Sequence, residues 1–311
     1  MNRIDASTWY VDTEYLGHEN LIATAGIDTS EGLLLVDPGP TTALETLTEK
    51  LSAAGYDWSD VTGLLLTHIH LDHAGAAGTI LQHHAPDATV YVHDLGAPHM
   101  VRPGRLLASA RRIYGDDMDR LWGAFESVPE DQVRVLEGGE TLNIGGREIE
   151  VAYTPGHAKH HVSYLDLSSE TAFIGDVGGM RVTGSDHIVP VMPPPDVDLE
   201  GWANSLGTII SWDPDRIFLT HFGPHVDVQR HIRVMAERID AFAETVRHTL
   251  DSNDQTSDAE LASRFAEKEN AHMRSVAEER FHEAYERFGQ PKDTWNGLAR
   301  YLRKHALSGK G

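Results

Sequence analysis

Three histidines and one aspartate, the side chains best suited to bind metal, lie close together after an apolar stretch: His68, His70, Asp72 and His73. Imidazole and carboxylate groups are ligands that suit Zn²⁺, Fe²⁺ or Mn²⁺. Because alternate residues of an extended chain face the same way, His68 and His70 should share one side. A histidine-rich surface turn is the alternative interpretation, and the pattern favours a metal site over it.

One loop cannot complete two coordination spheres, so any further ligands must come from the ends of other strands. Three candidates each directly follow a strand-like segment: His157, Asp176 and His221. Taken singly, either histidine could be a capping or core residue, and the aspartate could be a turn former. With the first four residues they make a set of seven candidate ligands.

The elements that must position these residues are predicted from hydrophobic spacing. Short apolar runs predict buried strands at 33–36, 61–66, 89–93, 162–167, 171–174 and 216–220. An alternating segment over 132–154 contains Gly145-Gly146, which is typical of a hairpin turn. Helices are predicted from Thr42, with Glu45 completing a capping box, and over 74–84 and 105–126. One long amphipathic helix follows Val226, and two or three more are predicted over 257–306.

Composition narrows the class of protein. The 311 residues carry a net charge of −22, which disfavours nonspecific binding to nucleic acid or to anionic membranes. No cysteine is present, so neither a disulfide nor a thiolate ligand can form. The chain shows no apolar segment of a secretory signal and no stretch long enough for a membrane helix, so we expect a cytoplasmic protein.

The ligand order His-x-His-x-Asp-His, then His, Asp and His, resembles the metallo-β-lactamase superfamily in its glyoxalase II-like binuclear form. The resemblance covers roughly residues 15–225 and includes the strings 36–39, 154–157 and 175–176. More narrowly, residues 66–77, 161–164 and 220–224 resemble generically named bacterial hydrolases of this fold. The resemblance implies an α/β fold, an αββα sandwich over 1–224, followed by a C-terminal helical region over 225–311.

The resemblance also implies roles for the ligands. His68, His70 and His157 would hold one divalent metal, and Asp72, His73 and His221 a second, with Asp176 bridging. Zinc is the favoured metal, with iron or manganese as alternatives. A water between two cations becomes a hydroxide nucleophile near neutral pH, which Asp72 would orient. Asp37 would be a buried carboxylate that supports the ligand loop.

The implied function is hydrolysis of a small ester, thioester or lactone. The lack of cysteine excludes β-lactamases of classes B1 and B2, Asp176 argues against class B3, and the absence of a tyrosine soon after Asp176 weakens a lactonase role. A phosphodiesterase or ribonuclease, a mononuclear iron persulfide dioxygenase and an inactive metal-binding scaffold are the alternatives.

The irregular stretch 178–198 is expected to wall the substrate pocket. Within it, Arg181 could bind an anionic group of a small-molecule substrate, and His225 could also contact substrate. The helical tail is expected to cap the core or to form a homodimer interface, although the tail of glyoxalase II binds its thiol carrier. The acidic balance argues against a nucleic-acid partner, and a membrane partner is not expected.

Overall fold

The protein is described from a computed structural model, which describes residues 1–252 and 256–308. The chain forms two compact units, and each is described by itself. The first unit contains Met1–Tyr153, His160–Gly175 and Trp212–Val226. The second contains Thr154–Lys159, Asp176–Ser211 and Asp227–Gly311. The predicted boundary at residue 224 stays a prediction, and 253–255 and 309–311 of its helical region lie outside the described residues.

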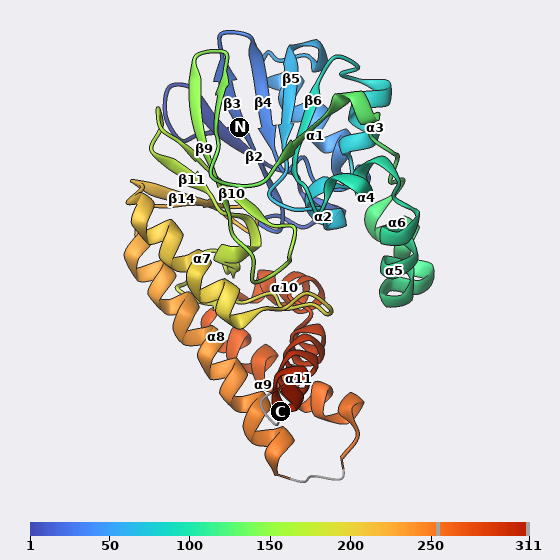
Figure 1. The fold of residues 1–311 in the computed structure, drawn as a ribbon, viewed down its shortest axis with the longest axis vertical. Helices are drawn as coiled ribbons and strands as arrows, with labels where there is room; N and C mark the ends of the chain where they lie inside the picture. Colours follow the sequence, from blue (N-terminus) through green and yellow to red (C-terminus); the bar gives the residue numbers. More distant parts are fainter. Residues whose placement is uncertain (253–255, 309–311) are drawn as a thin grey trace. The chain divides into compact units, whose positions relative to one another are not determined.

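A seven-stranded sheet in the first unit has its strands in chain order (Figure 1). Neighbours from β1 to β4 pair antiparallel, and neighbours from β4 to β7 pair parallel. Its strands are β1 (Asn2–Arg3), β2 (Thr8–Asp12), β3 (Ala23–Thr29), β4 (Gly32–Val36), β5 (Val61–Leu65), β6 (Thr89–His93) and β7 (Val133–Leu136).

A second sheet of the same unit has the order β15-β14-β11-β10-β9-β8. Its strands are β8 (Thr141–Ile144), β9 (Arg147–Tyr153), β10 (Val162–Asp166), β11 (Thr171–Phe173), β14 (Arg216–Leu219) and β15 (Gly223–His225). β11 and β14 pair parallel, and all other neighbours pair antiparallel. The predicted hairpin is confirmed, because Gly145 and Gly146 connect β8 to β9 at φ values of +51° and +80° that glycine adopts easily.

Side-chain alternation along β4 explains how the first sheet serves two hydrophobic cores. Leu33 and Leu35 pack into one core with α1 (Leu44–Ala53) and α3 (Ala77–His83). Leu34 and Val36 pack into the other core, together with residues of the second sheet such as Phe218. A strand buried on both faces reads as a continuous apolar run, which is why the sequence pattern located it.

Three helix predictions need correction. Thr42 forms no capping box with Glu45: it lies in a short 3₁₀ turn (Thr41–Ala43) before α1, and its hydroxyl donates to the Leu121 carbonyl. The helix predicted over 74–84 begins later, as α3 (Ala77–His83), and a separate short helix, α2 (Leu71–Ala74), precedes it. The segment 105–126 is divided into α5 (Gly104–Tyr114) and α6 (Met118–Trp122), because Gly115 turns the chain at φ +54°. The short helix α4 (Ala97–Val101) precedes α5.

The second unit is mainly helical. Its long helix α8 (Val228–Asp251) confirms the amphipathic helix predicted after Val226, since its buried residues include Ile232, Met235, Ile239 and Phe242. The other helices are α7 (Leu199–Trp212), α9 (Asp258–Val276), α10 (His282–Phe288) and α11 (Pro291–Ser308), and β12 (Met180–Arg181) pairs with β13 (Ile188–Val189). Within residues 1–252 and 256–308, no helix has the length and apolar character needed to cross a membrane.

Candidate metal centre

Strand ends in the first unit bring the central residues together. Asp37 directly follows β4, His68 lies three residues beyond β5, and His221 lies two residues beyond β14. β4 and β5 pair parallel, so their carboxyl ends open at the same edge of the sheet, where α/β folds commonly bind ligands. The short helix α2 begins at this edge and carries Asp72 and His73 (Figure 1).

Asp72, His73 and His221 form one group of converging ligand atoms. His221 Nε2 lies 3.2 Å from His73 Nε2 and 3.4 Å from Asp72 Oδ2, and His73 Nε2 lies 3.7 Å from the same carboxylate oxygen. These three ligand atoms all lie within 4.8 Å of one another, and both histidines are buried. The spacing and the donor types are those that a divalent transition metal requires.

The other ring nitrogen of each of these histidines is held by the protein. His73 Nδ1 lies 2.8 Å from an Asp37 carboxylate oxygen, and His221 Nδ1 lies 2.6 Å from the Leu21 carbonyl oxygen. Because both partners are acceptors, each Nδ1 carries the hydrogen and each Nε2 keeps its lone pair directed into the group. This arrangement is typical of metal-binding histidines, whose second nitrogen is fixed by a carboxylate or carbonyl.

Asp37 is the centre of a buried hydrogen-bond network, as its predicted structural role requires. Its side chain is fully buried and accepts from the Thr67 backbone N–H at 2.8 Å and from the Thr67 hydroxyl at 2.7 Å. The Thr220 hydroxyl donates to it at 2.7 Å. One carboxylate thereby joins the residue before His68, the residue before His221, and His73 itself.

Thr67 and Thr220 were missed by the sequence reasoning, although a signal for them exists. Each threonine directly precedes a candidate ligand, in Thr67-His68 and in Thr220-His221, at the end of a buried strand. A recurring Thr-His pair in two strand-end loops indicates a shared partner for the two hydroxyls. The partner proved to be Asp37.

His68 and His70 form a second pair in the first unit. His68 Nε2 lies 3.0 Å from His70 Nδ1, and the two rings are nearly perpendicular at 82°. His68 is buried and His70 is only partly buried. The expectation that alternate residues place these two histidines on one side is therefore confirmed.

His157 and Asp176 lie in the second unit. His157 Nε2 is 3.4 Å from Asp176 Oδ2, and His157 Nδ1 donates to the Val191 carbonyl oxygen at 2.7 Å. His157 thus shares the anchoring of His73 and His221, with Nε2 directed at a carboxylate. The preceding Gly156 has φ +146°, and an added Cβ would lie 2.5 Å from Trp202. Only glycine fits here, so the Thr-Pro-Gly-His string has a packing reason.

The two predicted substrate residues have protein partners. The Arg181 guanidinium pairs with Asp227 at 2.8 Å and with Asp186 at 3.0 Å, both in the second unit. These two carboxylates bind the guanidinium nitrogens with which Arg181 was expected to bind an anion. His225 ends its own strand, and its Nε2 lies 3.2 Å from the Phe222 carbonyl oxygen. Substrate contact by either residue stays a prediction.

An aromatic group in the first unit consists of Tyr15, Tyr114 and Trp122. Tyr15 stacks on Trp122 with ring centroids 5.8 Å apart, and Tyr114 meets the same indole edge-on at 5.1 Å. Burial raises the pKa of Tyr15, and the negative charge of Asp72 raises it further. Tyr15 therefore stays protonated, with its hydroxyl donating to the Leu121 carbonyl.

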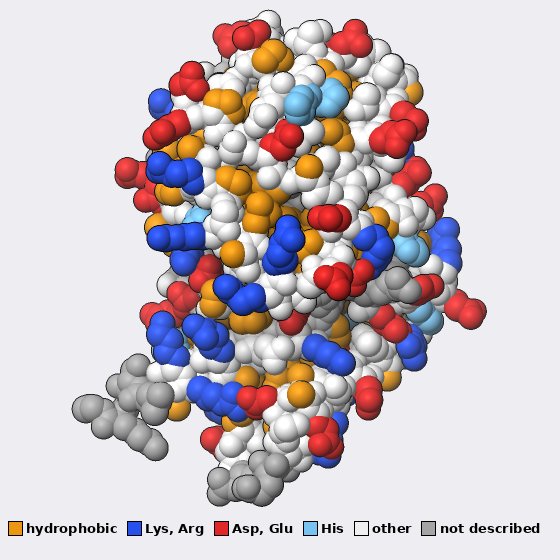
Figure 2. All heavy atoms as spheres, turned by 90° about the vertical axis from the view of Figure 1, so that its right-hand side faces the viewer, with side chains coloured by type: hydrophobic (Ala, Val, Ile, Leu, Met, Phe, Trp, Pro, Cys, Tyr) orange, Lys and Arg blue, Asp and Glu red, His pale blue; other side chains and the backbone are white. Residues whose placement is uncertain are grey.

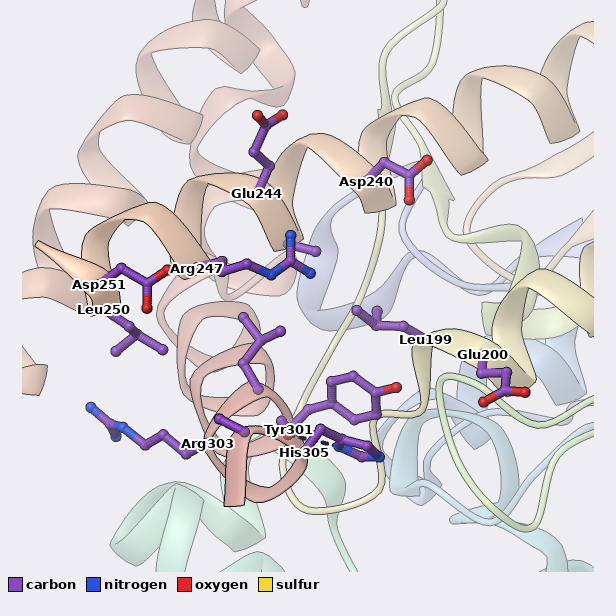
Figure 3. A pocket seen from close by; sticks show the side chains of 13 residues that line it. Leu199, Glu200, Asp240, Glu244, Arg247, Leu250, Asp251, Tyr301, Arg303 and His305 are labelled. Carbon is purple, nitrogen blue, oxygen red and sulfur yellow. Dashed lines mark hydrogen bonds between the residues drawn. The ribbon is translucent and has the colours of Figure 1, made fainter. Parts of the chain in front are cut away.

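A large groove lies elsewhere, within the second unit. It has a volume of about 1020 Å³ and runs between the start of α7, the end of α8 and α11 (Figure 3). Tyr301 and His305 project into it with ring centroids 4.0 Å apart, and Arg247 faces them from α8. None of the predicted site residues lines this groove, so its size does not identify it as the metal centre.

Comparisons with known proteins agree with this geometry. The family model described as the metallo-beta-lactamase superfamily matches residues 25–221. The chain is 29% identical over 181 residues to the metallo-beta-lactamase fold-containing protein ST1585 of Sulfurisphaera tokodaii, covering 56% of this chain and 66% of that protein. It is 28% identical over 162 residues to a hydroxyacylglutathione hydrolase of Synechococcus, covering 52% of this chain and 47% of that protein.

Solved structures show the same fold. A metallo-beta-lactamase family protein of Thermus thermophilus superimposes with a TM-score of 0.67, covering 92% of this chain and 89% of that chain at 20% identity. The predicted α/β class with C-terminal helices is thus confirmed. The family model spans more than half of the sequence and includes all seven candidate ligands, from His68 to His221. The chain therefore belongs to the metallo-β-lactamase superfamily.

Proposed function

We propose that this protein is a binuclear metal-dependent hydrolase that acts on a small thioester. The observation that carries the proposal is the group Asp72, His73 and His221, whose ligand atoms converge while each histidine Nδ1 is held by an acceptor. A structural histidine has no reason to keep a buried Nε2 lone pair facing another imidazole and a carboxylate. A divalent ion would satisfy all three groups.

We assign the second metal to Asp72, His73 and His221, and the first to His68, His70 and His157. Asp176 is proposed as the bridging ligand. Membership of the superfamily supports this set, as does the side-chain anchoring of His157 in its own unit. Zinc is the proposed metal, because imidazole and carboxylate are both ligands that zinc takes, with iron and manganese as alternatives for the same set.

Two bound cations would lower the pKa of a water and polarise the substrate carbonyl. Asp72 is partly exposed, whereas His73 beside it is buried, so the carboxylate can reach both a ligand position and solvent. We propose that Asp72 orients the attacking water and accepts its proton. The water oxygen would bond to the carbonyl carbon, the carbon–sulfur bond would break, and the proton held by Asp72 would pass to the leaving sulfur to give the free thiol and the acid.

The thioester class is favoured over esters and lactones by the names of two relatives, both hydroxyacylglutathione hydrolases. Besides the Synechococcus protein, a hydroxyacylglutathione hydrolase of Haemophilus influenzae is 26% identical over 165 residues. Because the chain spans only 47% and 63% of these two proteins, their activity is carried over as a proposal alone.

The direct test combines metal analysis with a substrate panel. We expect two metal ions per chain and preferential hydrolysis of thioesters over lactones and phosphodiesters by metal-replete protein. Asp176→Ala should lose at least one of the two ions, whereas His83→Ala, which alters an exposed histidine, should retain both. Two retained ions and full activity in Asp176→Ala would exclude the bridging assignment.

Other outcomes would move the function within the same fold. One iron per chain with oxygen uptake on a persulfide would indicate a dioxygenase, and cleavage of bis-p-nitrophenyl phosphate without thioester hydrolysis would indicate a phosphodiesterase. A homodimer stays a further proposal, which light scattering on the purified protein tests directly.

A further inference from the structure

Residues 95–115, which lie between β6 and α6, form a basic segment in a strongly acidic protein. No Asp or Glu occurs between Asp94 and Asp116, although the chain has 48 acidic residues against 26 Lys and Arg. Within this segment the cations are Arg102, Arg105, Arg111 and Arg112. A stretch of this kind is unexpected on a surface with a net charge of −22.

All four of these arginines are exposed, and none forms an ion pair with a carboxylate in the part of the chain that the structure describes. Exposed arginines elsewhere commonly do: Arg120 pairs with Asp117, and Arg264 pairs with Glu260. Arg181, which was expected to bind an anion, is held by two carboxylates. The four arginines, here called the arginine segment, therefore keep their donors available.

The helix α5 carries three of these guanidinium groups, those of Arg105, Arg111 and Arg112. Arg105 and Arg112 are seven residues apart, so they lie on the same face of the helix, about 10 Å apart along its axis. Ile113 lies beside them with 47% of its surface exposed. Figure 2 faces the side on which α5 lies in Figure 1 and shows Lys and Arg side chains, with Asp and Glu side chains among them, around exposed hydrophobic ones.

The arginine segment is connected to the proposed catalytic carboxylate by a short series of contacts within the first unit. Tyr114, the last residue of α5, contacts Trp122, and Trp122 stacks on Tyr15. The chain just after Trp122 also reaches α2, because the Thr41 hydroxyl lies 2.6 Å from the Ala124 carbonyl oxygen and 3.4 Å from that of Gly75, which directly follows α2. The segment therefore lies on the same side of the first unit as α2.

We propose that the arginine segment is a binding site for the anionic carrier group of the substrate, a thiol that bears phosphate groups. Guanidinium groups bind phosphate through paired hydrogen bonds, and two of them about 10 Å apart suit a ligand with two phosphate-bearing positions. This inference rests on the proposed thioester hydrolysis, and it adds the chemistry of the part that leaves as the thiol.

The arginine segment is expected to attract the anionic substrate from a distance and then to contact it once it is bound. A protein with a net charge of −22 repels an approaching anion on average. An unpaired basic surface beside the site therefore determines where an anionic substrate can approach the protein. Exposed charges are screened over about 8 Å at physiological salt, so the effect must weaken as salt is added.

The test compares two thioesters with the same acyl group, one carried by coenzyme A and one by the uncharged thiol N-acetylcysteamine. The measured quantity is the ratio of kcat/KM for the charged substrate to kcat/KM for the uncharged one. In Arg105→Glu/Arg112→Glu we expect this ratio to fall about 10-fold. In the original protein it should also fall as NaCl is raised from 50 to about 300 mM.

The matched control is Arg134→Glu/Arg300→Glu, which changes the net charge equally at two other exposed positions. This variant should keep the original ratio to within about twofold, because only local charge acts through the screening length. An unchanged ratio in Arg105→Glu/Arg112→Glu, or an equal fall in both variants, would overturn the proposal.

A second measurement separates this inference from the proposed function. Binding of free coenzyme A is measured by calorimetry on metal-replete protein, without any turnover. If neither thioester is hydrolysed but coenzyme A binds and the arginine variant binds it at least about 10-fold more weakly, the hydrolase proposal fails and the arginine site stands. If thioesters are hydrolysed and both proteins bind coenzyme A equally, the arginine site fails alone.

Discussion

Asp37 offers the sharpest test of how this fold holds its metal ligands. The carboxylate is fully buried and accepts from the Thr67 N–H, the Thr67 hydroxyl, the Thr220 hydroxyl and His73 Nδ1 at 2.7–2.8 Å. Asp37→Ala leaves these donors without an acceptor. The two hydroxyls can rotate towards other acceptors, but the backbone N–H and the imidazole cannot.

The expected cost follows from those two fixed donors. Each buried donor without a partner costs about 1–3 kcal/mol, so Asp37→Ala should lower the free energy of unfolding of the metal-free protein by about 2–6 kcal/mol. Asp37→Asn keeps one oxygen for the Thr67 N–H but places an NH₂ group near His73. It should cost less stability, while metal affinity falls about 10–100-fold because His73 loses the acceptor for its Nδ1–H.

Urea unfolding of metal-free protein and chelator competition for zinc measure the two effects separately. Asp94→Asn serves as the control, since this carboxylate is half-exposed and belongs to none of the candidate ligand groups. Unfolding of Asp37→Ala within about 1 kcal/mol of the original protein would refute the network argument. Unchanged zinc affinity in Asp37→Asn would refute the claim that Asp37 sets the tautomer of His73.

Three further predictions concern other parts of the molecule. Burial, and then the charges of Arg238 and His272, lower the pKa of His187 from 6.5 to about 3. Below pH 6.5 the imidazole of His187 binds a proton in the unfolded chain but not in the folded chain, so the free energy of unfolding should fall by up to about 2.7 kcal/mol from pH 6.5 to 4.5. The variant His187→Gln should remove this pH dependence of stability in unfolding experiments. Asp166 is fully buried and pairs with Arg147 at 3.1 Å, so Asp166→Ala should lower the free energy of unfolding in urea by about 3–5 kcal/mol. Asp117→Ala, which breaks an exposed pair with Arg120, should leave that free energy unchanged. Gly175 has φ +42°, and an added Cβ would lie 2.6 Å from the Thr67 hydroxyl oxygen, so Gly175→Ala should reduce both stability and metal content. The control Gly207→Ala, at an open position inside α7, should leave metal content unchanged and raise stability by about 0.5–1 kcal/mol.

The sequence determined the class of fold and the candidate ligands, because both are local properties. Strands buried on two faces read as apolar runs, and β4, β5 and β6 were found for that reason. Ligands at strand ends were found because the His-x-His-x-Asp-His string and the three later residues each carry their own signal. Helix boundaries were less accurate: the capping box at Thr42 is absent because its hydroxyl bonds to Leu121, a residue far along the chain.

Only the tertiary structure decided how the ligands are held and which cations are available. That Asp37, Thr67, Thr220 and His73 share one network depends on β4, β5 and β14 ending near one another, which no local pattern specifies. The same holds for the arginines: in the sequence Arg181 and Arg112 are equivalent cations. In the folded chain Arg181 is paired with Asp186 and Asp227, whereas the described carboxylates leave Arg112 unpaired, because pairing depends on distance in space and not along the chain.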